Sequence, residues 1–394
     1  MGQGGSSSQR HDADAGTADV KEHTTMSTTL SGQGQDRPEL QEAIEEIVES
    51  GFVGVQLRVN DEYGEWVGSA GARELGRSAK PLTNGHFRIG SSTKNFVATS
   101  VLMLVAEGKI DLDVPADDYL PECGLDRRIT VRMLLQHTSG IFNHTGELYE
   151  DGTFAPGVPW RGKEWVDNRF KTYLPEELVR LSLSKPARFA PGTGWSYANT
   201  NYVLARLVIE KVTGRSFAEE LQRLILGPLG MTGTVAPGTS SEIPEPHNHS
   251  YYRYEDAGQE KTVDITRENP SWVSAGGDMI STTQDLHTYF SALMGGKLLP
   301  AGLLAEMRTP EATVGYGLGL FVQDAGPKGG TVFHHNGGMA GSAALMYSTP
   351  DGTKTLTAGL TCVGDADLSI AAAFQNAQQR LVSEVFGGGP LKAG

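Results

Sequence analysis

The sequence of 394 residues contains only two cysteines. Cys123 and Cys362 lie far apart, and neither is accompanied by residues at metal-ligand spacing or by a redox partner. We therefore expect two buried free thiols, and neither a disulfide framework nor a redox site.

A long apolar run is absent from residues 1–36, which are rich in Gly, Ser, Thr and charged residues. A secretory signal or a membrane anchor requires such a run. The low hydrophobicity of this stretch cannot offset the entropy lost on ordering it, so we expect a disordered tail. The absence of an apolar run excludes a membrane role and predicts a cytoplasmic protein.

Basic residues are too few for a protein that binds nucleic acid. Lys and Arg number 33 against 47 Asp and Glu, so the formal net charge is −14. This balance argues against nucleic acid or an anionic membrane surface as the partner and favours a small molecule. Glycine, in contrast, is abundant at 50 residues, which indicates many tight turns and close backbone approaches.

Strand patterns gather at both ends of the sequence, and helical patterns fill the middle. Period-two or continuous apolar runs predict strands at 53–59, 66–70, 316–322, 330–334, 342–348 and 353–361. Apolar residues at helical spacing predict helices at 39–49, 131–136, 175–184, 201–214, 216–225, 283–294 and 368–386. The segments 140–172 and 230–270 are rich in turn-forming or polar residues and are expected to be loops.

These elements predict an α+β fold, in which an antiparallel sheet built from both chain ends is flanked by helices and an all-helical lobe is inserted. We assign one catalytic domain to 37–390. Its α/β lobe covers about 37–115 and 275–390, and its helical lobe about 116–274. A cleft between the lobes is the natural place for a site.

The stretch from Arg88 to Phe96 places a serine and a lysine three positions apart at the start of an apolar helix. Residues at i and i+3 share a helix face, so the Lys94 amine can take or hold the proton of the Ser91 hydroxyl. Burial favours the neutral amine that such a base needs. Ser-x-x-Lys alone is common by chance, and an N-cap serine followed by a solvated lysine is the more frequent explanation of the motif by itself.

Two further motifs strengthen the interpretation of Ser91 as a nucleophile. Tyr197 and Asn199 follow a Pro-Gly turn, where a phenol can exchange protons and an amide can hold a peptide-like substrate; a packed tyrosine and a capping asparagine are the alternative. The third motif is His335-Asn336-Gly337-Gly338, where a strand ends in two glycines that allow a ligand to approach the backbone.

We expect neither a metal nor another cofactor at these motifs. Adjacent residues of a strand point to opposite faces, so His334 and His335 make a poor joint metal site, and no carboxylate or cysteine stands at ligand spacing. One histidine is expected to face the cleft and the other to be structural.

Together the three motifs resemble those of the penicillin-recognising serine hydrolases. The sequence is most similar to the branch that holds D-alanyl-D-alanine carboxypeptidases, class C β-lactamases and related esterases. Supporting stretches lie at 134–140, 281–286 and 315–320. The resemblance implies the serine β-lactamase/DD-peptidase fold and spans nearly all of the chain after the tail.

The resemblance also implies roles for individual residues. Ser91 attacks a carbonyl to form an acyl-enzyme, Lys94 and Tyr197 handle protons, and either of these two can be the acylation base. Asn199 holds the substrate amide, and His335 stands where the family places a polar or cationic group. The remaining implied residues are the oxyanion hole formed by the N–H groups of Ser91 and Gly338, and an aromatic cleft wall at Trp272.

Two departures from the family pattern bear on the substrate. Where carboxypeptidases of this branch bind the terminal carboxylate of the substrate with an arginine and hydroxyl groups, this sequence has Phe321, Asn336 and Gly338. The missing secretory signal also weakens a role in the cell wall. We therefore expect a cytoplasmic serine acyl-transfer enzyme for a small ester or amide, with water or an amine as acyl acceptor. An esterase or a transacylase of secondary metabolism fits this description.

Two alternatives stay open at this point. The first is a D-alanyl-D-alanine carboxypeptidase or D-amino-acid peptidase that binds the carboxylate through other cations, for example Arg161, Lys163 or Arg169 of the long loop. The second is a catalytically silent ligand-binding scaffold, against which the intact Ser91, Lys94, Tyr197 and His335 argue.

Overall fold

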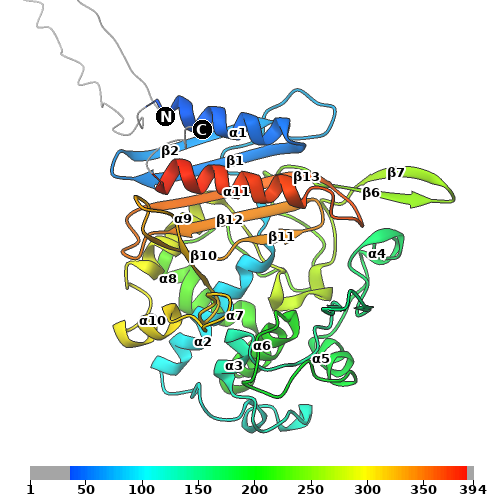
Figure 1. Cartoon of the computed structure of the whole chain (residues 1–394), viewed down its shortest axis with the longest axis vertical. Coiled ribbons are helices and arrows are strands. Elements are labelled where there is room, and N and C mark those ends of the chain that lie inside the picture. The colour runs from blue at the N-terminus through cyan, green and yellow to red at the C-terminus, as the bar shows by residue number, and fades with distance from the viewer. Residues whose placement is uncertain (1–35, 388–394) are drawn as a thin grey trace, which may run out of the picture. The chain divides into compact units, whose positions relative to one another are not determined.

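A computed structural model describes residues 36–387 (Figure 1). Its main sheet follows the order β2-β1-β13-β12-β10-β9, and every neighbouring pair along this path is antiparallel. The strands are β1 Phe52–Asp61, β2 Gly64–Gly71, β9 Phe321–Asp324, β10 Thr331–His334, β12 Ser342–Ser348 and β13 Thr355–Gly364. Because β1 pairs directly with β13, the two ends of the chain meet in the centre of the sheet, which confirms the predicted α+β fold class.

Two terminal helices cover one face of this sheet. Helices α1 Pro38–Glu49 and α11 Ala371–Phe386 lie side by side there (Figure 1). Leu40 and Ile44 of α1 and Leu381 of α11 are fully buried against apolar side chains of the strands. The apolar faces that the patterns at 39–49 and 368–386 predicted therefore do pack on the sheet.

The opposite face of the sheet carries the larger core. Helix α2 Thr93–Ala106 is apolar on nearly all sides and runs through this core, as a helix buried all round must. Helices α6 Asn199–Thr213 and α9 Thr283–Met294 pack against α2 and the sheet, respectively. The remaining helices are α3 Val131–Gln136, α4 Gly162–Asn168, α5 Pro175–Leu183, α7 Phe217–Leu221, α8 Gly227–Leu229 and α10 Ala301–Arg308.

The middle of the chain is not wholly helical, contrary to the prediction. Strands β6 Tyr251–Asp256 and β7 Gln259–Asp264 form a hairpin, and β6 joins β13 in parallel. The segment 230–270 was expected to be a loop because β7 is polar and mostly exposed, so it lacks the apolar alternation of a half-buried strand. The loop 140–172 likewise contains α4 and the two-residue strands β4 Glu147–Leu148 and β5 Phe154–Ala155.

The strand expected at 316–322 begins only at Phe321. Gly315 and Gly319 both have positive φ angles, which break a regular strand upstream of β9. The apolar pattern there reflects core packing, since Leu318 and Leu320 are buried without being part of a strand.

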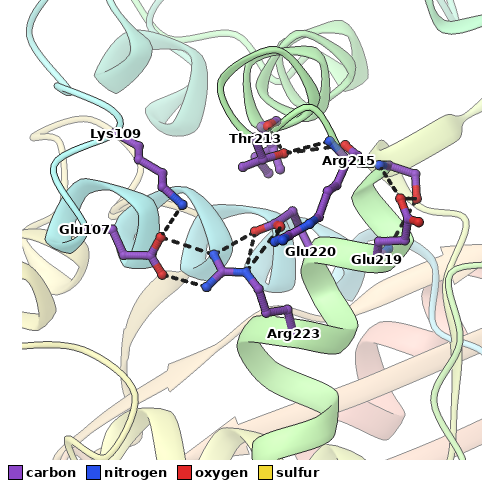
Figure 2. Close-up of polar contacts among 9 residues, drawn as sticks. Glu107, Lys109, Thr213, Arg215, Glu219, Glu220 and Arg223 are labelled. Atoms are coloured by element: carbon purple, nitrogen blue, oxygen red, sulfur yellow. Dashed lines mark hydrogen bonds and ion pairs between the residues drawn. The ribbon is translucent and has the colours of Figure 1, made fainter.

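Charged side chains fasten the C-terminal end of α2 to α7 (Figure 2). Glu107, which follows α2, accepts hydrogen bonds from Arg223 and forms an ion pair with Lys109. Arg223 also donates to Glu220 of α7, and Arg215 donates to the same carboxylate, whose side chain is fully buried. The helix that begins beside Ser91 is thus held at its far end by a connected ion-pair network.

The predicted disordered tail lies outside the described residues, apart from Asp36. The division of 37–390 into two lobes stays a prediction. Among residues 36–387, no helix is both long enough and apolar enough to cross a bilayer.

Candidate active site

Ser91 lies on a tight turn that only glycine neighbours permit. Gly90 has φ +49°, and a Cβ atom there would lie 2.6 Å from the backbone nitrogen of Gly338. A Cβ atom on Gly337 would overlap the carbonyl oxygen of Ile89 and lie 2.7 Å from the backbone nitrogen of Ser91. Strand β11 Gly337–Met339 therefore packs directly on the turn, with Gly338 against the backbone of Gly90 and Gly337 against that of Ser91.

The Lys94 side chain is fully buried and has three polar partners. Its Nζ atom lies 3.1 Å from Ser91 Oγ, 2.7 Å from Asn199 Oδ1 and 2.6 Å from the carbonyl oxygen of Gly276. No carboxylate forms an ion pair with it among the described residues. Burial lowers the pKa of Lys94 well below its ordinary value, so the neutral amine is favoured.

The chemistry of these partners determines where the amine hydrogens point. The Asn199 and Gly276 oxygens can only accept, so a neutral amine donates its two hydrogens to them. The lone pair then faces the third partner, the hydroxyl of Ser91. This arrangement suits a general base for a serine nucleophile.

Tyr197 approaches Ser91 from the other side. Its hydroxyl lies 2.7 Å from Ser91 Oγ, and the Lys94 Nζ atom lies 4.5 Å from the centre of its ring. Burial raises the pKa of Tyr197 above its ordinary value, so the phenol stays protonated at neutral pH. Lys94 and Tyr197 thus contact the same oxygen of Ser91 with opposite preferences. The lysine amine favours its deprotonated form, and the tyrosine phenol favours its protonated form.

Asn199 is occupied on both ends of its amide. Its Oδ1 atom accepts from Lys94, and its Nδ2 atom donates to Thr145 Oγ1 at 3.1 Å. Its side chain also lies against Gly276, where a Cβ atom would be 3.1 Å away. Asn199 therefore positions the lysine, and its expected contact with a substrate amide stays a prediction.

His335 is buried, with 1% of its surface exposed, and both ring nitrogens have partners. Nδ1 lies 2.9 Å from the Asn336 carbonyl oxygen, and Nε2 lies 3.0 Å from the Tyr316 hydroxyl. Burial, with a smaller contribution from Lys94, lowers the pKa of His335 to about 3. The imidazole is therefore neutral at physiological pH, so it does not supply the cationic group that the family resemblance allowed.

The neighbours of His335 are also engaged within the protein. Asn336 Nδ2 donates to the Tyr347 hydroxyl at 2.7 Å, and its Oδ1 accepts from the Met346 amide. His334 is half-buried and stacks between Phe321 and Tyr347. His335 is buried against Tyr316 and close enough to Lys94 for the lysine to affect its pKa, and which of the two histidines faces the cleft stays a prediction.

Phe321 and Trp272 lie in different surroundings. Trp272 is nearly buried and lines a cavity of about 280 Å³ that begins at Gly338. Phe321 packs its ring on Tyr316 and His334 and is not among the residues that line this cavity.

The three cations suggested for a carboxylate clamp are also separated. Arg161 lines the cavity, whereas Lys163 is paired with Asp167 and Arg169 donates to the Val166 carbonyl. Only the first of these cations is placed where it can meet a substrate in that cavity.

His137 is a residue of the site that the motif analysis did not single out. Its ring lies 4.4 Å from the Tyr197 ring, and its Nδ1 accepts from the backbone amide of Ala198 and from Asn201. Its carbonyl oxygen accepts from the backbone amide of Ser196. His137 therefore holds the residue before Tyr197 and the residue after it. The Leu-Leu-Gln-His-Thr-Ser-Gly stretch at 134–140 was the signal that could have identified this role.

For metals, the sequence predicts only that none is bound at the three motifs. Among residues 36–387, no three His, Cys, Asp or Glu side chains come together in a way that could hold a metal ion.

Residues 40–375 match the beta-lactamase family. The chain belongs to this family. A D-stereospecific amidohydrolase from Streptomyces sp. is 36% identical with a TM-score of 0.77, and the similarity covers 90% of this chain and 100% of that chain. The D-amino acid amidase from Ochrobactrum anthropi SV3, complexed with L-phenylalanine amide, is 26% identical with a TM-score of 0.76 and coverages of 89% and 98%.

Curated relatives match over shorter regions. Penicillin-binding protein 4* of Bacillus subtilis (strain 168) is 26% identical over 302 residues, which are 73% of this chain and 63% of that protein. Esterase EstB of Burkholderia gladioli is 37% identical over 169 residues, or 40% of each protein. The chain thus spans less than two thirds of the length of these curated relatives. The resemblance to the penicillin-recognising serine hydrolases is confirmed, and the chain is a serine hydrolase homologue of that fold.

Proposed function

We propose that this protein is a serine acyl-transfer enzyme that forms an acyl-enzyme on Ser91 from an ester or amide whose leaving group is uncharged. The observation that supports this proposal most strongly is the buried Lys94 amine, which has no carboxylate partner among the described residues and whose lone pair faces the Ser91 hydroxyl. A lysine with a merely structural role would be expected to pair with a carboxylate or reach solvent.

The contacts support Lys94 as the acylation base. As Ser91 Oγ bonds to the substrate carbonyl carbon, its proton moves to the Lys94 amine. The carbonyl oxygen becomes an oxyanion, for which the neighbouring N–H groups of Ser91 and Gly338 are suitable donors. The positive end of the α2 dipole, which begins at Thr93, favours the same charge.

Tyr197 suits the role of proton donor to the leaving group. When the bond from carbonyl carbon to leaving oxygen or nitrogen breaks, the phenol gives its proton to that atom, and the Lys94 ammonium restores the phenol. Water or an amine then attacks the acyl-enzyme, and the neutral Lys94 amine takes its proton. That proton passes to Ser91 Oγ when the bond between Ser91 and the acyl group breaks. We assign His335 a supporting role, since its neutral ring contacts Tyr316 just after the end of β10 and its carbonyl oxygen accepts from Ser92.

The relatives narrow the proposed substrate class. Two similar structures are named for D-specific amide chemistry, and a curated relative is named an esterase. We propose that the acyl donor is an amide or ester of a D-amino acid or a related small acyl group. A small-molecule partner, a cytoplasmic location and the two-lobe arrangement belong to the same proposal, which includes no role for nucleic acid or membranes.

A carboxypeptidase is the second candidate, because a penicillin-binding protein is among the relatives. Arg161 is the one suggested cation that lines the cavity beside Gly338. Against this candidate, Gly338 offers open space in place of a hydroxyl and Asn336 is tied to Tyr347. A catalytically silent scaffold is disfavoured by the complete hydrogen bonding of Lys94 and Tyr197 to Ser91.

The test is trapping of the acyl-enzyme. Incubation with D- and L-phenylalanine amides and esters, quenching, and peptide mass analysis should find the acyl group on Ser91, with the D-enantiomers reacting faster. Ser91→Ala should not be labelled. Labelling at another residue, or none with any of these substrates, would refute the proposal.

A further inference from the structure

The Gly276 carbonyl oxygen, which accepts from Lys94 at 2.6 Å, belongs to a short helical turn that begins at Ser274. The backbone amides of Gly277 and Asp278 both donate to the Ser274 carbonyl oxygen, at 2.9 and 3.0 Å. Ser274 itself has φ +47°, a left-handed conformation that serine adopts rarely. Such a conformation persists only where its surroundings hold it, so the contacts of Ser274 determine whether the turn keeps its shape.

Arg206 of helix α6 contacts both ends of this turn. Its Nη1 atom donates to Ser274 Oγ at 3.0 Å, and its Nε atom donates to Glu210 Oε1 at 3.0 Å. Glu210 Oε1 also accepts from the backbone amide of Phe217, so the guanidinium is fixed on both sides. Burial raises the pKa of Asp278, just after the turn, to about 6, and the nearby charge of Arg206 opposes that rise.

Helix α6 thereby supports both acceptors of the Lys94 amine. Asn199, at the start of the helix, binds Lys94 directly through Oδ1. Arg206 lies about two helical turns further along the same face and supports the second acceptor, Gly276, through the turn. A Cβ atom on Gly276 would lie 3.1 Å from the Asn199 side chain, so the turn and the helix start are in contact. A displaced turn would therefore misdirect one of the two amine hydrogens that leave the lone pair facing the serine hydroxyl.

Resting on the proposed function, we propose that Arg206 is a positioning residue, which keeps the Gly276 carbonyl oxygen directed at Lys94 by fixing the turn at Ser274. The hydrogen-bond partners of its guanidinium among the described residues are Ser274 and Glu210, so its effect on the reaction passes through the backbone of the turn. The ion pair with Glu210 alone would stabilise the helix slightly and leave turnover unchanged. The contact with Ser274 adds a catalytic consequence, because a small misplacement of a catalytic group lowers the rate by about tenfold to 10²-fold.

The first experiment compares Arg206→Met with Arg206→Lys and with the control Lys211→Met. Methionine cannot donate a hydrogen bond, whereas lysine keeps the charge and can donate to Ser274. Lys211 is the matched control, because it lies on the same helix and pairs with Glu122. With p-nitrophenyl acetate as substrate, Arg206→Met should lower kcat about tenfold and change KM less than about twofold. Arg206→Lys should recover part of the loss, and Lys211→Met should leave both constants unchanged.

The second experiment tests whether Arg206 acts through Lys94. Ser91 Oγ attacks the phosphorus of a fluorophosphonate probe and fluoride leaves, so the labelling rate measures the activation of the hydroxyl. Arg206→Met should slow labelling about tenfold in the wild-type background and less than about twofold in the Lys94→Ala background, where no amine is left to position. If Arg206→Met does not fold, Ser274→Gly takes its place, because it removes the Oγ acceptor but tolerates the left-handed backbone; it should slow labelling by a similar factor.

Four results would overturn the positioning role while Ser91 of the wild type is still labelled. These are an unchanged kcat in Arg206→Met, an equal loss in Lys211→Met, no recovery by Arg206→Lys, and an equal slowing of labelling with and without Lys94. If Ser91 of the wild type were not labelled at all, the proposed function would fall and the positioning role with it.

Discussion

The two ends of helix α2 place lysines in opposite environments. At its start, Lys94 is fully buried among oxygens that only accept and a serine hydroxyl, with no carboxylate beside it. Just beyond its end, Lys109 is exposed and pairs with Glu107, which also binds Arg223 (Figure 2). One helix therefore carries a lysine prepared for proton transfer and a lysine that takes part in structural ion pairs.

The difference between the two lysines shows that the presence or absence of a carboxylate partner, more than the residue type, determines whether a lysine stays charged. Arg223 and Lys109 lower the pKa of Glu107 to about 2, so this end of the helix stays charged. At the other end, burial without an acid lowers the pKa of Lys94 and makes the amine a usable base.

The largest effects should follow from substitutions at the catalytic end. Ser91→Ala and Lys94→Ala should each reduce kcat by about 10⁴-fold or more, because members of one catalytic unit fail together. The double variant should be hardly worse than either single one, measured with a p-nitrophenyl ester. Near-wild-type turnover by Lys94→Ala would remove the contrast between the two lysines.

The pH profile should reveal the same contrast. Because the pKa of Lys94 is lowered, kcat/KM should rise about tenfold per pH unit on the acid side until the amine is neutral and then stay level. It should fall again only when Tyr197 ionises at high pH, since burial raises the pKa of the phenol. Tyr197→Phe should cost about 10²-fold or more, keep the acid limb and lose the alkaline one. An acid limb that moves in this variant would reassign the base.

His137 offers a subtler disturbance of the same end. His137→Ala removes the acceptor for the Ala198 amide and should lower kcat about tenfold or more by releasing Tyr197. His137→Asn retains an acceptor and tolerates the positive φ of this position, so it should recover part of the rate. The alkaline limb of the pH profile should shift in His137→Ala. A loss of stability with an unchanged limb would show that the histidine is merely structural.

Phe321→Arg tests whether a charge can be added beside the site. In the wild type, a neutral ester should be turned over faster than a matched substrate ending in D-alanine carboxylate, because a buried carboxylate lacks a charge partner. The variant should narrow that ratio by about tenfold or less, because the Phe321 ring packs on His334 and Tyr316 and lies outside the cavity. Equal turnover of both substrates by the wild type would indicate a carboxylate site elsewhere, with Arg161 the first residue to replace.

The smallest effect is expected at the structural end. Glu107→Gln should lower the free energy of unfolding at neutral pH by about 1 kcal/mol after solvent screening, with turnover unchanged. The pKa of Glu107 is lower in the folded protein than its ordinary value of 4.5, so its contribution is present above pH 4.5 and is lost as pH falls toward 2. Urea unfolding of both proteins at pH 7 and pH 2.5 should show the difference shrinking. A constant difference would mean that the charge is not responsible.

The chain's own patterns predicted much of the scaffold. Helix 131–136 and helix 283–294 have the predicted bounds, and the first hairpin and the terminal helices lie where apolar periodicity placed them. The hairpin β6–β7 and helix α10 were missed, because polar exposed strands and short helices carry little periodic signal.

The sequence by itself determined the identities of Ser91, Lys94 and Tyr197, because a nucleophile, an amine at i+3 and a following phenol are readable as local motifs. Only the tertiary structure shows that the pKa of Lys94 is lowered and that of Tyr197 is raised, since these shifts depend on burial by residues far away in the chain. It also placed His335 against Tyr316, joined His137 to Tyr197 and assembled the cavity from distant segments. Desolvation and packing between distant residues are not encoded in any one stretch, and they determine the protonation state of each group and the space left for a substrate.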